Sequence, residues 1–381
     1  MGFLVPVLGV KLDFPHIIYQ GLTIYLLIAI GWHGGEELAR LPLSELGQAG
    51  GFMLVGFLSN FVVGVTAYMI LRTLTKLRRV DAATVAGYYG SDSAGTYATC
   101  VGVLMTAKLA FAPYMPVMLA VMEIPGCLVA LLLVSLARRQ GMDALGNMPG
   151  EPGYDPVAKP GATMDLAEEP HTPRDHPTPE RRAVGDEAEL ELGWMDEDGN
   201  GGGKPPLFTP ELLHEVFLNP GIYLLLAGIA IGFFSGHQGY TKEPDRVFLS
   251  LFPGLLCLFL LEMGMTASRK LRDLRRAGWR FIAYGILAPN LYATMGILVA
   301  HGYGMLTHQH FELGTYVLFS VLCGAASYIA VPAVQRLAIP EASPTLPLAA
   351  SLGLTFSYNV TIGIPVYIQI AKLVAEKFPI S

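Results

Sequence analysis

Nine long apolar segments constrain this chain more than any other feature. Each has roughly the 20 mostly apolar residues that a helix needs to cross the hydrocarbon core of a bilayer. A soluble chain would carry about a quarter charged residues, whereas here 15% are charged and 52% are hydrophobic. The sequence therefore predicts an all-α integral membrane protein with spans at Ile17–Gly34, Gly47–Leu71, Asp81–Thr106, Tyr114–Ala137, Glu211–Ser235, Val247–Ser268, Trp279–His301, Leu313–Gln335 and Leu346–Val374.

A shorter apolar run, Phe3–Val10, precedes the nine spans. It is too short to cross a bilayer on its own. We interpret it as a first span that is truncated, re-entrant, or cut by a wrongly assigned start. The expected total is then about ten helices, five on each side of residues 140–206.

Residues 140–206 differ from the rest of the chain in composition. They hold 15 of the 31 acidic residues and 10 of the 27 prolines. Because such a segment has too few apolar residues to offset the entropy lost on ordering, we predict a disordered linker. The expected divisions are a first five-helix repeat (1–139), this acidic linker (140–206) and a second repeat (207–381). The acidity belongs to the linker, so it does not indicate a nucleic-acid partner.

Basic residues cluster in alternate loops, which predicts orientation through the positive-inside rule. The rule places the linker in the cytoplasm and both termini outside. We expect the protein to lie in the inner (plasma) membrane of the cell. An odd number of spans per half then inserts the second half upside down, as in many secondary transporters. The clustered residues are Arg72, Lys76, Arg78, Arg79, Arg138, Arg139, Arg269, Lys270, Arg272, Arg275, Arg276, Arg280 and Arg336.

Two spans contain matching polar or small-residue interruptions, one in each half: Gly90–Thr96 and Cys323–Pro332. Backbone at membrane depth leaves the helical pattern only where protein or a water-filled cavity satisfies it. The freed helix N-termini would offer amides to an anion. Small residues can also simply permit tight helix packing. Our candidate anion-binding residues are Gly90, Ser91, Ser93, Ala94, Gly95, Thr96, Ser327, Tyr328, Ile329 and Ala330.

The presence of Asp92 favours an ion-binding site over simple helix packing. An ionisable residue at mid-bilayer costs at least ~2.5 kcal/mol and is by default functional. Carboxylate, hydroxyl and amide oxygens suit a hard cation such as sodium, for which we expect Asp92, Ser93, Ser327 and Asn359 as ligands. Asp92 and Glu123 are the candidate coupling residues, and proton coupling through Asp92 remains open. Glu262 is a weaker candidate, and His33 and His301 should be interfacial.

Five motifs give the chain a resemblance to the sodium-dependent bicarbonate transporters of photosynthetic bacteria and their relatives. The resemblance implies a sodium-coupled bicarbonate symporter with core and gate domains in inverted five-helix repeats, commonly trimeric. It also implies an anion held between the two interrupted helices, and a cytoplasmic PII-like regulator. The motifs are IGWHGG at Ile30–Gly35, RVDAATVAGYYGSDSAGT at Arg79–Thr96, MEIPG at Met122–Gly126, LFPGLLCLFLLEMGM at Leu251–Met265 and AVPAVQRLAIPEASPT at Ala330–Thr345.

The chain departs from that family's pattern at the second interruption. Bicarbonate members have a serine-rich stretch followed by an aspartate there, whereas this chain reads Ala325-Ala326-Ser327-Tyr328-Ile329-Ala330. Asp92, in turn, stands where those members are apolar. The carboxylate has moved from one interrupted helix to the other, which would keep a cation site and reshape the anion pocket.

Two other functions compete with secondary transport. An uncoupled anion pore, or a transporter-like sensor with a different or no transported substrate, would follow if the altered second interruption had lost coupling. Intramembrane hydrolysis by a serine of the GSDSAG motif at Gly90–Gly95 would need a histidine at membrane depth, and an aspartate pair would need a second mid-span aspartate. Neither is evident in the sequence, so we do not expect an enzyme.

Overall fold

The computed structural model describes residues 2–10, 12, 14–40, 43–156, 220–270, 278–343 and 345–379. This part of the chain is helical and contains no strand. Six of its helical segments are long and apolar enough to cross a membrane: Ile17–Leu38, Ala49–Leu74, Met115–Arg139, Lys242–Arg269, Trp279–Thr307 and Thr345–Lys377. The expectation of a helical membrane protein is therefore confirmed.

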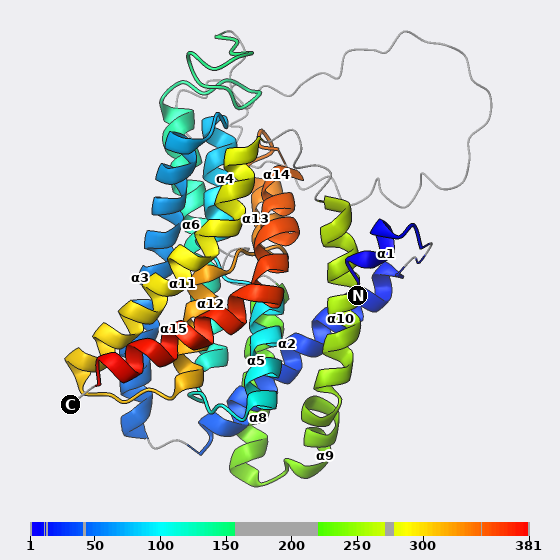
Figure 1. Ribbon diagram of the computed structural model, residues 1–381, viewed down its shortest axis with the longest axis vertical. Coiled ribbons are helices and arrows are strands. Elements are labelled where there is room, and N and C mark those ends of the chain that lie inside the picture. Colours follow the sequence, from blue (N-terminus) through cyan, green and yellow to red (C-terminus); the bar gives the residue numbers. More distant parts are fainter. Residues whose placement is uncertain are drawn as a thin grey trace, which may run out of the picture.

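The first half of the chain forms one very short helix, three long helices and one interrupted span. The apolar run at the N-terminus forms only the four residues of α1, which lies beside α10 in Figure 1. The interrupted span is the pair α4 and α5, where the sequence analysis placed a break. The bounds are α1 Leu4–Val7, α2 His16–Leu38, α3 Leu43–Leu74, α4 Arg79–Tyr89, α5 Ala94–Ala107 and α6 Met115–Arg139.

The second half likewise contains an interrupted span, the pair α12 and α13. The last predicted span, Leu346–Val374, is not a plain α-helix, because its middle is wound as π-helix, a form that is often found at functional sites. The bounds are α8 Pro220–Gln238, α9 Lys242–Asp245, η2 Arg246–Ser250, α10 Phe252–Lys270, α11 Trp279–Thr307, α12 Leu313–Gly324, α13 Ala330–Ala338, α14 Thr345–Leu348, η4 Ala349–Phe356, η5 Asn359–Gly363 and α15 Ile364–Lys377.

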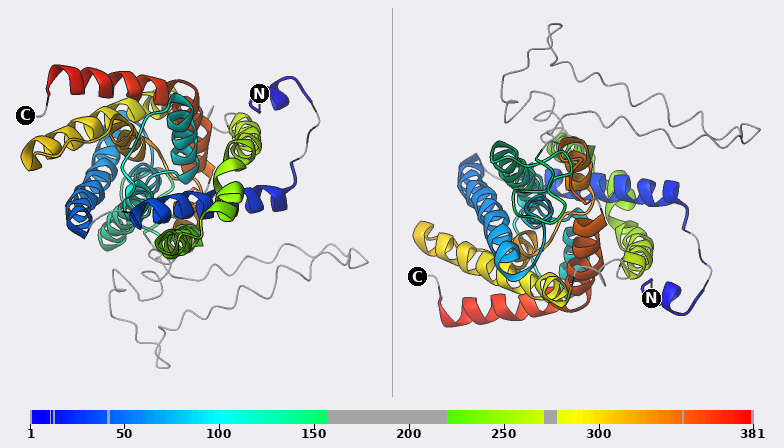
Figure 2. Two further views of the ribbon diagram at one scale, coloured as in Figure 1. Left: turned by 90° about the horizontal axis from the view of Figure 1, so that it is seen from below. Right: turned by 90° about the horizontal axis from the view of Figure 1, so that it is seen from above.

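The helices form two groups that lie side by side. In Figure 2, α2, α8 and α10 occupy one side of the molecule, and α3 to α6 pack with α11 to α15 on the other. Helices α2 and α8 approach very closely, because a Cβ atom on Gly31 would overlap the carbonyl oxygen of Leu225. Small residues permit such contact between helices in a membrane. We call α1, α2, α8 and α10 the α2 group. We call α3 to α6 together with α11 to α15 the α4–α12 group, after the first helix of each interrupted span.

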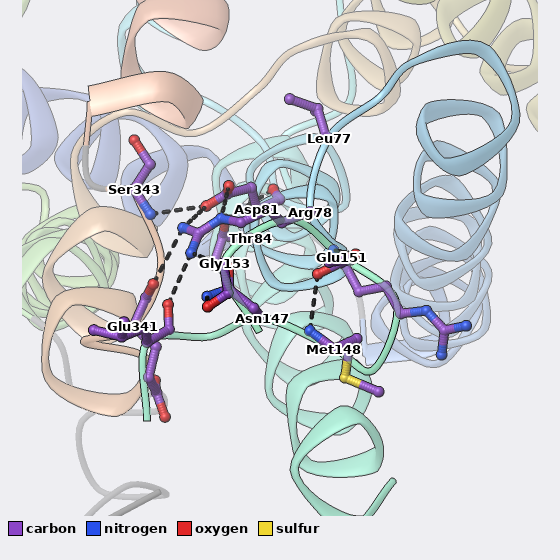
Figure 3. A network of polar contacts seen from close by, with 12 residues as sticks. Leu77, Arg78, Asp81, Thr84, Asn147, Met148, Glu151, Gly153, Glu341 and Ser343 are labelled. Atoms are coloured by element: carbon purple, nitrogen blue, oxygen red, sulfur yellow. Dashed lines mark hydrogen bonds and ion pairs between the residues drawn. The ribbon is translucent and has the colours of Figure 1, made fainter. Parts of the chain in front are cut away.

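A polar network joins distant parts of the chain at one end of the molecule, where α4 begins (Figure 3). Arg78 donates hydrogen bonds to both carboxylate oxygens of Asp81, at 2.8 and 3.0 Å, and to the carbonyl oxygens of Leu145 and Glu341, at 2.8 and 3.3 Å. Asp81 also accepts from the amide of Ser343 at 2.9 Å. These bonds position the start of α4 against the loop that follows α13.

A second arginine strengthens the same junction. Arg138, at the end of α6, makes a two-pronged ion pair with Glu341, with donor–acceptor distances of 3.0 and 2.8 Å. Its guanidinium also donates to the carbonyl oxygen of Ala338, the last residue of α13, at 2.9 Å. Planar two-pronged pairs of this kind fix geometry as well as adding energy. The ends of both interrupted spans are therefore tied together.

The structure corrects the start of the predicted disordered linker. Residues 140–156 fold back on this end of the molecule, and Met142 and Met148 are 2% and 3% exposed. Asp143 holds the loop, because its carboxylate accepts from the amides of Asn147 at 2.7 Å and Asp155 at 2.9 Å. The polar composition of this loop suggested disorder, but its polar groups are paired with its own backbone. Residues 157–206 lie outside the described residues.

Candidate functional site: the crossing of two interrupted helices

The first interruption separates α4 from α5. Helix α4 ends at Tyr89, followed by Gly90, and α5 begins after Ser93, whose backbone is extended at φ −139° and ψ 111°. The hydroxyl oxygen of Ser93 accepts from the amide of Thr96 at 3.3 Å and from its hydroxyl at 2.9 Å. Serine is favoured at this position because its oxygen satisfies an amide that has no partner inside the helix. The sequence Ser-Asp-Ser therefore ends one helix and starts another.

The second interruption separates α12 from α13. Helix α12 ends at Gly324, and Ala325 is extended at φ −86° and ψ 177°. The amide of Val331, in the first turn of α13, donates to the hydroxyl of Ser327 at 3.4 Å. In each interruption, a serine hydroxyl therefore accepts a hydrogen bond from a backbone amide of the helix that follows.

The two interruptions are in direct contact. The amide of Ser327 donates to the carbonyl oxygen of Tyr88 at 2.8 Å, across two segments far apart in the sequence. Contact is also tight on the other side, because a Cβ atom on Gly95 would overlap the hydroxyl oxygen of Tyr328. We call this region, Gly90–Ser93 together with Ala325–Ile329, the crossing.

A small cavity lies at the crossing. Its volume is about 10 Å³, which is space for about one water molecule. A four-atom oxyanion needs more room than that, so the crossing is closed in this structure. Leu27 of α2 is the one member of the α2 group that lines it. The lining residues are Leu27, Ser93, Ala94, Glu123, Ser327, Tyr328 and Ile329.

Asp92 is a fully buried carboxylate at the crossing. Its side chain is 0% exposed, and neither carboxylate oxygen has a hydrogen-bond partner in the described part of the chain. Glu123, which is 8% exposed, lines the crossing cavity. A buried, unpartnered carboxylate is stable only if it carries a proton or binds a cation. The described residues contain no cluster of three or more histidine, cysteine, aspartate or glutamate side chains placed to hold a metal ion.

Several predicted site residues support the backbone in this structure. Ser91 donates to the carbonyl oxygen of Glu123 at 2.7 Å, which joins the first interruption to α6. Asn359 donates to the carbonyl oxygen of Gly324 at 3.0 Å and accepts from the hydroxyl of Tyr367 at 2.7 Å. Asn359 thus holds the end of α12, and its role as a sodium ligand stays a prediction. Ala330 begins α13.

Asn60 lies next to the crossing, close to Gly90, and was not among the predicted site residues. It lies in α3 and is 0% exposed. Its amide nitrogen donates to the carbonyl oxygens of Met122 at 2.8 Å and Leu322 at 3.4 Å, so it joins α3 to α6 and α12. Its own side-chain oxygen has no partner in the described part of the chain. The signal in the sequence was a lone asparagine inside an apolar span.

The fold and the crossing together define a class, that of multi-pass helical membrane proteins with discontinuous helices, an arrangement that many secondary transporters share. A comparison with protein families matches residues 1–372 to the Na+-dependent bicarbonate transporter superfamily. The match covers nearly the whole chain, and the chain belongs to this family. It is therefore a transporter and not an enzyme. No curated protein matches the chain.

Proposed function

We propose that the protein is a sodium-coupled symporter that imports a small anion, and that the anion is bicarbonate, as the family description indicates. The observation that carries the proposal is the contact between the two interruptions, where Asp92 is buried with no hydrogen-bond partner among the described residues. Transporters of this architecture bind solute and coupling ion where helices are discontinuous.

The helix ends at the crossing support binding of both ions. Helices α5 and α13 begin there, and the first amides of a helix lack partners within it. Those amides and the positive ends of the helix dipoles favour an anion. Helices α4 and α12 end there, and their last carbonyl groups favour a cation. Asp92, Ser93 and Ser327 would add oxygens to that cation site.

Coupling follows from the charge of Asp92. With no cation bound, the ionised carboxylate would be buried without compensation, which is strongly unfavourable. A bound cation removes that cost and adds positive charge next to the amides that would receive the anion. Each ion therefore binds better in the presence of the other, and by linkage the effect is reciprocal. Glu123 lines the same cavity and would modulate the charge balance.

The closed crossing cavity requires movement between the two helix groups. We propose that the α2 group is the gate, that the α4–α12 group is the core, and that separation of Leu27 from the crossing admits the ions. We further propose two inverted five-helix repeats, a homotrimer surrounded by lipid in the inner membrane, a cytoplasmic linker with both termini outside, and regulation by a PII-like protein. These finer points rest on the resemblance and on the distribution of basic residues.

The test is uptake of labelled bicarbonate into proteoliposomes at varied sodium concentration and pH, with other small anions as competitors. We expect uptake that rises with sodium and is lost in Asp92→Asn. Uptake that follows pH and ignores sodium would assign the coupling to protons. Uptake that ignores both gradients would refute coupling.

One observation favours the uncoupled alternative. The second interruption carries Ala325 and Ala326 where more hydroxyls would serve an anion, and both are buried, at 0% and 2% exposed. A pore would let labelled anion equilibrate without accumulating, and a sensor would move none. Accumulation against a concentration gradient separates the three functions.

A further inference from the structure

Three cavities follow one another along α2. The crossing cavity touches α2 at Leu27. A second one, the inner cavity, has a volume of about 20 Å³ and touches α2 at Ala29, Ile30 and His33. A third, the outer cavity, has a volume of about 180 Å³ and touches α2 at His33, Gly34 and Glu37. At about 1.5 Å per residue, the row extends over roughly 15 Å of helix.

The opposite wall of this row is built largely by α5. Ser93 and Ala94 border the crossing cavity, and Tyr97, Val101 and Met105 border the inner cavity. Both helices run away from the crossing toward the end of the molecule opposite the Arg78 network (Figure 1). The segment after α5 completes the outer cavity with Ala110, Phe111, Pro113 and Pro116. The cavities therefore mark a seam between the α2 group and the α4–α12 group.

The wall of the inner cavity is almost wholly apolar, and His33 and Tyr97 are the two polar residues that line it within the described part of the chain. The Nδ1 atom of His33 and the hydroxyl of Tyr97 are both buried and have no hydrogen-bond partner in the described part of the chain. Buried polar atoms without partners are rare in proteins and call for an explanation. Tyr97 lies one helical turn from the crossing, because its amide donates to the carbonyl oxygen of Ser93 at 2.9 Å.

His33 stands where the inner and outer cavities meet. His33, Phe111 and Pro116 line both cavities, and the rings of His33 and Phe111 meet edge to face with centroids 6.2 Å apart. Glu37, on the wall of the outer cavity, is paired with Arg40 at 2.6 Å, which offsets the repulsion that a lone carboxylate would exert on an anion. The outer cavity, at about 180 Å³, has room for an ion and part of its hydration shell, whereas the inner cavity has space for about one water molecule.

We infer that the seam between α2 and α5 is the access route of a small oxyanion, and that His33 and Tyr97 donate hydrogen bonds to the ion along this route. This inference rests on the proposed transport function and names the path to its site. The imidazole and phenol groups donate to oxygens of an ion that sheds part of its hydration at the narrow inner cavity. Movement of His33 and Phe111 lets the ion pass from the outer cavity inward.

Cysteine labelling tests the route without relying on transport. In a Cys257→Ala background, which removes the exposed native thiol, Val101→Cys places a thiol in the inner cavity. Native Cys100 is the matched control, because it is the preceding residue of α5, is 0% exposed and lines none of the three cavities. A small, charged, membrane-impermeant thiol reagent is added to intact cells from outside. We expect Val101→Cys to react, Cys100 to stay unreacted, and bicarbonate to slow the reaction at position 101.

Transport variants test the same route by a second measurement. Val101→Trp fills the inner cavity and should lower bicarbonate uptake roughly tenfold or more, whereas Val62→Trp, at a site 47% exposed on α3, should not. His33→Leu removes a donor to the ion and should lower uptake roughly tenfold, with recovery in His33→Gln. Melting temperature in detergent identifies any variant that fails to fold, and for such a variant the labelling result decides.

The outcomes separate the route from the transport function. Full uptake in folded Val101→Trp and His33→Leu, or an unreactive thiol at position 101 in a protein that transports, would overturn the route and leave the function standing. A wild-type protein that moves no anion would refute the function. Reaction at Cys100 as readily as at position 101 would show a general opening of the helices and would also overturn the route.

Discussion

The amide of Ser327 donates a hydrogen bond to the carbonyl oxygen of Tyr88 at 2.8 Å, and this bond places the second helix interruption against the end of α4. Tyr88 and Ser327 belong to different halves of the chain, so neither half can build the crossing alone. Both residues are buried, with 3% and 2% of their surface exposed. A backbone bond of this kind holds the two helix breaks against each other in this structure.

Asp92→Asn should fold and lose sodium-stimulated uptake. The amide replaces a buried carboxylate that has no partner in the described part of the chain, so melting temperature should stay the same or rise, because the cost of burying a charge is removed. Uptake of labelled bicarbonate is the measurement. Glu262→Gln is the matched comparison: Glu262, the weaker candidate, lies in α10, lines none of the three cavities and accepts a hydrogen bond from Thr266 at 2.8 Å, so its substitution should leave sodium dependence unchanged. Unchanged sodium dependence in Asp92→Asn would remove Asp92 from the mechanism.

Asn60→Ala should lower both stability and uptake. The substitution leaves the carbonyl oxygens of Met122 and Leu322 without this donor, and each unsatisfied buried group costs about 1–3 kcal/mol. Thermal melting in detergent measures the first effect. Ser59→Ala is the control, because the Ser59 hydroxyl bonds only within its own helix, to the carbonyl oxygen of Val55. If the two variants melt alike, Asn60 does not tie the crossing together.

Gly95→Ala should impair transport, and Tyr328→Phe should partly restore it. An added methyl group at position 95 would overlap the Tyr328 hydroxyl and come within 2.9 Å of the ring of Phe259. Removing the hydroxyl relieves the first clash, so the pair should be non-additive by about 0.5–3 kcal/mol. Gly102→Ala is the control on the same helix, because its added methyl meets only the end of the Leu256 side chain. Additive effects of the two substitutions would argue against close packing here.

The loop at residues 140–156 should make stability depend on acid pH. Burial alone would raise the pKa of Asp143, but hydrogen bonds from Asp155, Asn147 and Leu145 outweigh it and hold the pKa below its ordinary value. A folded-state pKa below the unfolded value of about 3.9 means that the stabilisation is complete well above that pH. It is lost as pH falls through the folded-state pKa.

The measurement is melting temperature against pH between about 6 and 3. We expect Asp143→Asn to melt lower than the wild type at neutral pH and to show a flatter acid dependence. Glu243→Gln, at an exposed ion pair with Arg246, should leave the curve unchanged. A wild-type curve that is already flat over this range would contradict the role given to Asp143.

The positions of the two interruptions could be predicted from sequence because glycine, serine and aspartate inside apolar spans have local consequences. Serine caps helices and glycine ends them, so the break between Tyr89 and Ala94 follows from the residues at the break. The six long apolar helices could likewise be predicted, because hydrophobicity is a property of each segment alone.

Contacts between distant segments could not be predicted in this way. The bonds from Arg78 to Leu145 and Glu341 join residues far apart in the chain, and no local pattern specifies them. The loop around Asp143 has a composition typical of disorder, but its order depends on hydrogen bonds to its own backbone and on burial against α6. Asn60 could not be predicted because a single polar residue in an apolar span does not show which distant helices its side chain will join.

The central claim is that a sodium gradient drives an anion through the crossing, and steady-state accumulation measures it most directly. Purified protein is reconstituted, an inward sodium gradient is imposed, and the ratio of internal to external labelled bicarbonate is followed at constant pH. The account predicts a ratio that exceeds its value without a sodium gradient, rises with the gradient and returns to the baseline in Asp92→Asn. A wild-type ratio that stays at the baseline under every sodium gradient would contradict it.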